Sequence, residues 1–173
     1  MGDAPAVSAS TGVAVDTVIE DDRWGTAGLE ALADRAAQAA AGWLRAGAAE
    51  IVVMGCDDDR IAALNADFRG KPRATNVLSW PSIEHEPHAP GARPTLPDDE
   101  EWGDIAISYE TCAAEASAQG KPFADHVTHL LVHAILHLVG YDHENDADAE
   151  TMEAAERSIL QTLGIPDPYA ETM

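Results

Sequence analysis

Three histidines near residue 140 have the spacing of a metal site. His133 and His137 are four positions apart, and His143 follows Gly140 by three. Residues four apart on a helix lie about 40° apart around the axis and about 6 Å along it, so the first two imidazoles project side by side. Gly140 can supply the left-handed turn that returns His143 as a third ligand. Three neutral nitrogen donors and a fourth position for water are typical of a catalytic zinc site, here with one ion per chain.

A polar, histidine-rich helix face is the alternative interpretation, and for a histidine in isolation it is the more common one. His126, His129, His133 and His137 all fall on one helical stripe. The surrounding run is apolar, however, and imidazoles without partners would cost free energy to bury there. A metal ion removes that cost for His133 and His137. We expect His129, one turn before His133, to lie outside the ligand set.

The stretch from His133 to His143 resembles the signature of the YbeY family of bacterial endoribonucleases that process rRNA. Every fixed position of that signature matches except the second, where the chain has the small residue Ala134 instead of Gly or Ser. Other blocks resemble the family in the same order, and they are Leu64-Asn65, Phe68-Arg69, Thr75 to Pro81 and Gly103 to Ile105. The resemblance runs from about residue 50 to residue 163 and omits the first dozen residues and the loop at 82–100.

The resemblance implies a metal-dependent, single-strand-specific endoribonuclease acting in rRNA maturation and ribosome quality control. It implies catalytic roles for the three histidines and Arg69, and single-stranded RNA and ribosome-associated proteins as partners, with no DNA and no membrane. Two alternatives remain. A metalloprotease is disfavoured because Ala134 stands where proteases of the His-Glu-x-x-His type carry their general base. A non-catalytic ribosome-assembly factor, in which zinc only ties a helix to the following turn, is the other.

Basic residues are scarce, and three of them cluster before the Thr75 block. The formal net charge is −21, from 10 Lys and Arg against 31 Asp and Glu. An RNA-binding surface therefore needs a local inversion of charge, which Arg69, Lys71 and Arg73 offer. We assign substrate binding to these three residues and to Asn76, and charge stabilisation during phosphodiester cleavage to Arg69. A solvated loop with chance charges is the alternative.

Asp142 stands between the turn and the third histidine. A carboxylate in that place can accept a hydrogen bond from a metal-bound imidazole and orient it. The alternative for Asp142 is an ordinary carboxylate at a helix end.

Composition indicates one domain of a cytoplasmic protein. A chain of 173 residues that is 46% hydrophobic is long enough for one core. No apolar run is long enough to cross a membrane, and the first residues lack the pattern of a signal peptide. Cys56 and Cys112 have no zinc-site spacing and are most simply reduced core thiols.

Hydrophobic periodicity and turn residues predict an α+β fold, with a small mixed sheet of about four strands, about five helices, and the zinc site at the end of a central helix. The predicted strands are 13–19, 50–56, 76–80 and 103–108. The predicted helices are 26–45 with Thr26 as its N-cap, a short helix after the N-cap Asp57, 109–118, 123–139 and 146–163. We expect a flexible N-terminus at 1–12, a single domain at 13–165 and a tail at 166–173. The proline-rich acidic insertion at 82–101 is expected to be mobile and dispensable for folding, and we assign no metal to its His85 and His88.

Overall fold

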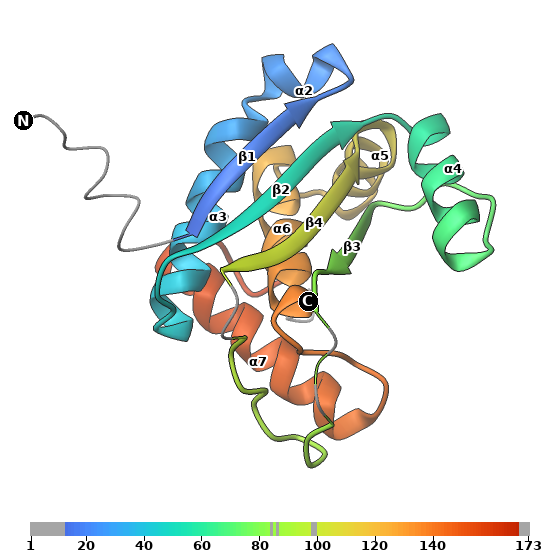
Figure 1. Ribbon diagram of the computed structural model, residues 1–173. Helices are drawn as coiled ribbons and strands as arrows, with labels where there is room; N and C mark the ends of the chain where they lie inside the picture. Colours follow the sequence, from blue (N-terminus) through green and yellow to red (C-terminus); the bar gives the residue numbers. More distant parts are fainter. Residues whose placement is uncertain (1–12, 84, 86, 98–99, 170–173) are drawn as a thin grey trace, which may run out of the picture.

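A four-stranded mixed sheet forms the centre of the molecule (Figure 1). The computed structural model describes residues 13–83, 85, 87–97 and 100–169, so the predicted flexible segment 1–12 lies outside the described residues. The strands are β1 (Val13–Ile19), β2 (Ala49–Cys56), β3 (Val77–Pro81) and β4 (Glu101–Ser108). They are arranged β1-β2-β4-β3, with β1, β2 and β4 parallel and β3 antiparallel to β4. The predicted fold class and the four strands are confirmed, and β3 is an edge strand.

Six helices occur in the described residues, one more than the sequence predicted. They are α2 (Asp22–Ala27), α3 (Leu29–Leu44), α4 (Asp58–Arg69), α5 (Tyr109–Gln119), α6 (Phe123–Leu138) and α7 (Asp146–Thr162). The predicted helix capped by Thr26 is wrong at its start, because Thr26 lies inside the short α2. Gly28 adopts a left-handed conformation with φ 80° and separates α2 from α3. Glycine adopts that conformation without a steric cost, and the sequence prediction overlooked this break.

Helix α4 begins at its predicted N-cap and ends at a glycine. The Asp57 side chain accepts a hydrogen bond from the Arg60 backbone N–H at 2.8 Å, as an N-cap does. At the other end Gly70, with φ 68°, is a left-handed C-cap directly after Arg69. The helix therefore ends where the basic loop begins, and Arg69 occupies its last turn.

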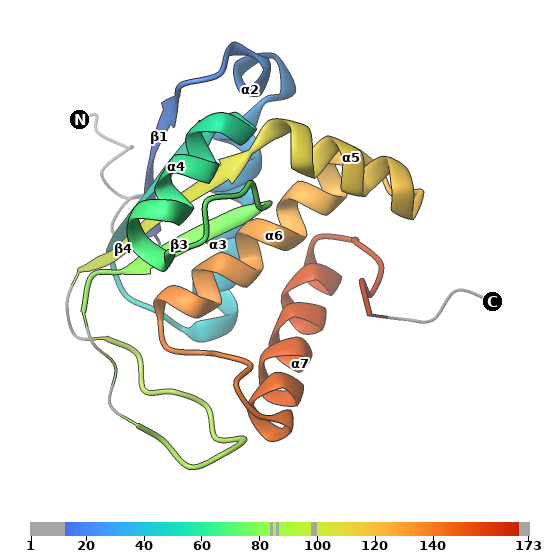
Figure 2. The ribbon, with the colours of Figure 1, turned by 90° about the vertical axis from the view of Figure 1, so that its right-hand side faces the viewer.

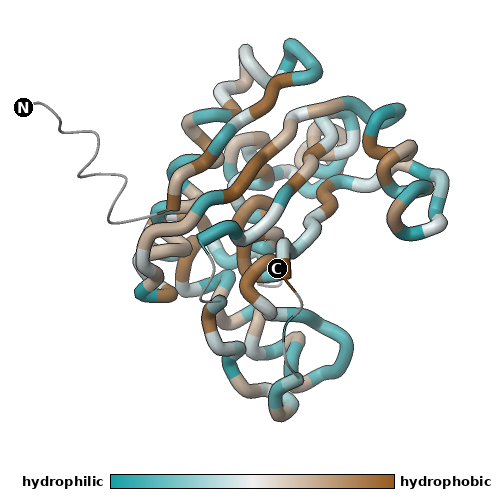
Figure 3. Tube along the Cα trace, viewed as in Figure 1, coloured by the Kyte–Doolittle hydropathy of each residue, from teal (hydrophilic) through white to brown (hydrophobic). Residues whose placement is uncertain are grey.

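Helices α3 and α6 cover one face of the sheet, and α7 packs outside them (Figures 1 and 2). The buried strand residues on this face include Ile51, Val53, Ile105 and Ile107. Helix α6 is buried along most of its length, and each fully buried Leu or Val contributes about 1.5–3 kcal/mol relative to exposure. Hydrophilic residues gather instead in the outer loops (Figure 3). Helix α6 is therefore a rigid support for the histidines it carries.

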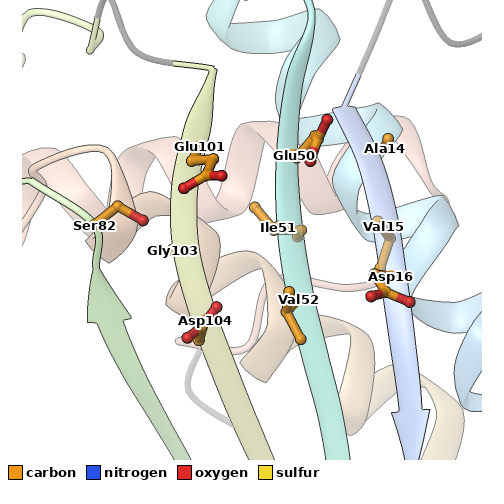
Figure 4. A pocket seen from close by; sticks show the side chains of 10 residues that line it. All are labelled: Ala14, Val15, Asp16, Glu50, Ile51, Val52, Ser82, Glu101, Gly103 and Asp104. Carbon is orange, nitrogen blue, oxygen red and sulfur yellow. The ribbon is translucent and has the colours of Figure 1, made fainter.

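The opposite face of the sheet is only partly covered. Ile61 of α4 packs with Leu78 and Ala106 at one end of this face. The rest is open and forms a shallow hollow of about 400 Å³, whose acidic side chains are Asp16, Glu50, Glu101 and Asp104 (Figure 4). A hollow lined by carboxylates repels a polyanion, so RNA is not expected to bind there.

The insertion between β3 and β4 has no helix or strand in its described residues, as its prolines predict. Its described residues nevertheless contact the domain. One His85 ring nitrogen lies 2.7 Å from the Leu138 carbonyl oxygen, and the Arg93 guanidinium lies 4.6 Å from the centre of the Trp43 ring. These contacts favour a held segment over a freely moving one, although the predicted mobility itself stays a prediction.

Two further sequence expectations concern single features. The thiols of Cys56 and Cys112 are both free and buried, and burial raises the pKa of the Cys56 thiol to about 12. Within the described part of the chain, every helix is too short or too polar to pass through a lipid bilayer.

Candidate metal centre

Helix α6 and the turn after it bring the three predicted histidines to one pocket. His133 and His137 lie one turn apart on α6 and are half-buried, and they line a pocket together with residues of β3. After Leu138 the chain turns at Gly140, whose φ is 111°. The Tyr141 N–H donates to the Leu136 carbonyl at 3.1 Å and closes this turn. The turn directs His143 back toward the helix.

The pocket has a volume of about 530 Å³ and is lined by all three imidazoles. The ring centres of His133 and His143 are 5.6 Å apart, with 28° between the ring planes. Burial lowers the pKa of His137, and the neighbouring His133 and His143 lower it further. The neutral imidazole is therefore favoured, which is the form that binds a metal ion.

Two side chains from other elements hold the first two imidazoles. Ser79 Oγ on β3 lies 2.8 Å from Nδ1 of His137. Glu156 on α7 accepts from Nδ1 of His133 at 2.7 Å. With Nδ1 engaged, the second ring nitrogen of each histidine is the one available to a metal, and partners of this kind fix the tautomer and the orientation of a ligating ring. The chemistry of these three nitrogen donors thus fits a bound divalent ion.

Glu156 is fully buried and has three partners. It accepts from Nε2 of His129 at 2.8 Å and from the Tyr169 hydroxyl at 2.6 Å, in addition to His133. Burial alone would raise the pKa of this carboxyl, but the hydrogen bonds from His129 and His133 outweigh burial and hold it at about 2. Glu156 is therefore a carboxylate at neutral pH. Tyr169 comes from the segment predicted as a tail, and it lines the same pocket.

Sequence reasoning missed Ser79 and Glu156. Ser79 stands inside a block that matches the family resemblance, so its inclusion there was a usable signal. Glu156 is one of several acidic residues in α7. Only its position on the buried side of an amphipathic helix distinguishes it, because a carboxylate there needs partners.

The predicted substrate-binding residues are divided by the structure. Arg69 and Asn76 line the pocket, whereas Lys71 and Arg73 are exposed in the loop beside it. The Asn76 amide donates to Glu115 at 3.1 Å and its oxygen accepts from the Val77 N–H at 2.6 Å. Asn76 therefore has a clear role in holding the start of β3, and its contact with substrate stays a prediction.

Asp142 belongs to a second group of side chains that could hold a metal ion. The ligand atoms of His88, Asp142 and Asp148 lie within 4.8 Å of one another, and no other group in the described ranges meets this distance. The two Asp148 oxygens already accept from the Gly91 N–H and the Asn145 amide, both at 2.8 Å. This group therefore ties the insertion to α7, and it could also hold a metal ion, although the sequence predicted no metal at His88. The three imidazoles as metal ligands stay a prediction. The orienting role predicted for Asp142 stays a prediction.

Comparison with known proteins identifies the family and agrees with the fold. The sequence model of the family described as "Endoribonuclease YbeY" matches residues 17–164. Among curated proteins, "Endoribonuclease YbeY" of Paracoccus denitrificans is 69% identical over 157 residues, covering 91% of this chain and 90% of that protein. The protein of the same name from Cereibacter sphaeroides is 56% identical, covering 90% of this chain and 98% of its own length. The chain belongs to the YbeY family.

A solved structure supports the fold independently. The solution structure of a Thermotoga maritima protein superposes with a TM-score of 0.55 and covers 91% of this chain and 99% of its own. The two sequences are 23% identical. At that identity the match shows a shared fold.

Proposed function

We propose that the protein is a zinc-dependent, single-strand-specific endoribonuclease that acts in rRNA maturation and ribosome quality control. The observation that carries the proposal is the pocket in which His133, His137 and His143 meet Arg69. The names of the family and of its curated members agree with it, since they describe endoribonucleases. A cytoplasmic location, with ribosome-associated proteins as partners and without DNA or membrane, belongs to the same proposal.

Several side chains in and around this pocket have separate roles in the proposed reaction. His133, His137 and His143 would hold zinc, which would supply a bound water of near-neutral pKa and a positive charge to polarise a phosphoryl oxygen. Ser79 and Glu156 keep the imidazoles of His137 and His133 oriented toward the pocket. The Arg69 guanidinium, on the pocket wall, neutralises charge that grows on the non-bridging phosphate oxygens as the bond breaks.

Elemental analysis together with RNA cleavage tests the proposal. The wild type should contain about one zinc per chain and cut single-stranded RNA, because a set of nitrogen ligands favours zinc. His137→Ala should lose both properties and keep its helix content. His88→Ala is the matched control, since it removes a histidine from the second group only, and it should keep its zinc. Full zinc occupancy in His137→Ala, with loss of zinc in His88→Ala, would instead assign the metal to the group that contains His88.

The same experiment separates the two alternatives. A non-catalytic assembly factor would bind zinc in the wild type but cut no RNA, and His137→Ala would change only its stability. A metalloprotease would cut a denatured protein substrate instead. Ala134 occupies the place of the missing glutamate, so we expect no peptide cleavage.

A further inference from the structure

Phe68 is an exposed aromatic ring on the wall of the candidate metal centre. It is 62% exposed, whereas the other exposed large hydrophobic residues in the described ranges lie between 38% and 41%. Leaving a phenylalanine this open forgoes most of the free energy that its burial would contribute. Its ring therefore adds little to the fold, and a partner would have to supply its missing contacts.

Trp80 supports this ring from one side. The ring centres of Phe68 and Trp80 are 5.3 Å apart and their planes meet at 64°, an edge-to-face contact. Trp80 is itself packed against the buried cluster between α4 and the sheet. Phe68 is thus held in place at the end of α4 while much of its surface stays open.

The position of the ring identifies what it would bind. Phe68 and Trp80 line the same pocket as Arg69 and the three imidazoles. Phe68 is also the immediate neighbour of Arg69 in the last turn of α4. A ring face next to a guanidinium matches the two parts of a nucleotide, because the base has an apolar face and the phosphate is an anion.

The charge of the chain favours such a contact. With 31 acidic and 10 basic residues, the protein repels the RNA backbone at long range, so phosphate contacts alone are a weak source of affinity. Stacking of a base on an aromatic ring needs no net positive charge. We propose that Phe68, braced by Trp80, is a stacking subsite for one unpaired nucleobase of the RNA beside the cleaved phosphate.

This subsite rests on the proposed function and deepens it, since it supplies a reason for single-strand selectivity. A base inside a duplex has both faces covered by its neighbours and cannot stack on a protein ring without being unpaired. For an unpaired base, stacking on a protein ring requires little free energy. The bases of duplex RNA would therefore not bind at Phe68, even where the phosphates of the duplex reach Arg69.

A fluorescent base can locate the contact. The zinc-loaded protein is mixed in a stopped-flow instrument with short oligoribonucleotides that carry 2-aminopurine at successive positions, and the fluorescence is read before cleavage. We expect strong quenching at one position with the wild type. Phe68→Leu, which keeps an apolar side chain without a ring, should lose that quenching and weaken binding about 5-fold to 150-fold. Phe68→Tyr keeps the ring and should behave as the wild type.

An abasic nucleotide at the quenched position provides the decisive comparison. Without a base to stack, the wild type and Phe68→Leu should bind equally well. Val18→Ala, at an exposed hydrophobic residue on β1, is the control for a general loss of apolar surface and should bind normally. The same loss on base-containing and abasic RNA, or unchanged binding by Phe68→Leu, would overturn the subsite.

Failure of the subsite can be told from failure of the proposed function. A wild type that cuts RNA, with variants at Phe68 that cut and bind equally well, removes only the subsite. A wild type that neither binds nor cuts any RNA removes both. Normal RNA binding by Phe68→Leu with loss of a protein partner would assign the ring to a protein interface instead and overturn the proposal.

Discussion

Arg69 is the residue whose removal should affect chemistry alone. It lies in the exposed last turn of α4, so its loss costs no core packing. Arg69→Ala should lower RNA cleavage about 100-fold or more at saturating RNA, since a contact made only in the transition state is worth on the order of 3 kcal/mol. Zinc content and melting temperature should stay near wild type. Single-turnover kinetics would measure this change.

Arg73→Ala is the matched control for that experiment. Arg73 is exposed and lies outside the pocket, so at saturating RNA this variant should cut at the wild-type rate. Unchanged cleavage by Arg69→Ala would mean that no catalytic positive charge faces the metal. That result would support the alternative of a non-catalytic ribosome-assembly factor.

Glu156 should control how tightly the metal is held. Glu156→Gln keeps the shape of the side chain but removes the charge that accepts from His129 and His133. Loss of a partner of this kind typically costs 10-fold to 100-fold in metal affinity, so about that loss of zinc affinity is expected. Competition with a chelating dye measures it, with circular dichroism to confirm folding.

Glu153→Gln is the matched control on the same helix. Glu153 is partly exposed and its partner is Arg157, so zinc affinity should not change. Tyr169→Phe removes one donor to Glu156 and keeps the carboxylate, and a small effect is expected. Equal zinc affinity in Glu156→Gln and the wild type would show that the carboxylate does not orient His133.

At the scale of elements, Asp148 joins the insertion to the start of α7. It accepts from the Gly91 N–H, and the neighbouring Thr151 hydroxyl donates to the Gly91 carbonyl at 2.6 Å. Asp148→Ala should therefore release the described part of the insertion and speed hydrogen exchange and proteolysis there. Asp146→Ala, in the same helical turn, controls for the loss of a charge at the helix N-terminus. Equal exchange in both variants would favour an insertion that is already mobile.

The pH dependence of the contact between the insertion and α7 follows from the carboxyl group of Asp148. The Gly91 N–H, followed by the Asn145 amide, lowers the pKa of this carboxyl below its usual value of 3.8. The folded pKa is thus below the unfolded one, so the contribution to stability is present above about pH 4 and is lost as the pH falls through the lowered pKa. Release of the insertion in acid should accordingly be absent in Asp148→Ala, where the tie is already broken.

At the scale of the whole molecule, the scarcity of basic residues should make the affinity for RNA depend only weakly on salt concentration. Each phosphate neutralised on a single strand adds about 0.7 to the slope of log affinity against log salt. With Lys71 and Arg73 as the basic residues that neutralise phosphates in the bound state, the slope should be about −1.4. Lys71→Ala should bring it closer to zero by about 0.7 and weaken binding. A much steeper slope would indicate a basic surface elsewhere on the chain.

Local sequence was enough for the four strands, for most of the helices and for a histidine motif whose members meet in one pocket. Strands and helices repeat their hydrophobic residues with periods of two and 3.6, which a single stretch of sequence displays. The spacing of His133 and His137, followed by Gly140 and His143, is equally local, and the pocket contains all three imidazoles. Thr26 was misread because a glycine two positions later breaks the helix, and the propensity of the surrounding alanines hid that break.

The tertiary structure decided the contacts between residues that are far apart in the chain. Ser79 reaches His137 across 58 positions, and Glu156 reaches His133 across 23. Phe68 meets the pocket only because β3 pairs with β4 as an edge strand and carries Trp80 beneath the ring. Hydrophobic pattern determines which face of an element is buried, but not which element covers it. The sequence by itself therefore determined the strands and the histidine motif, and packing decided which distant side chains meet its imidazoles.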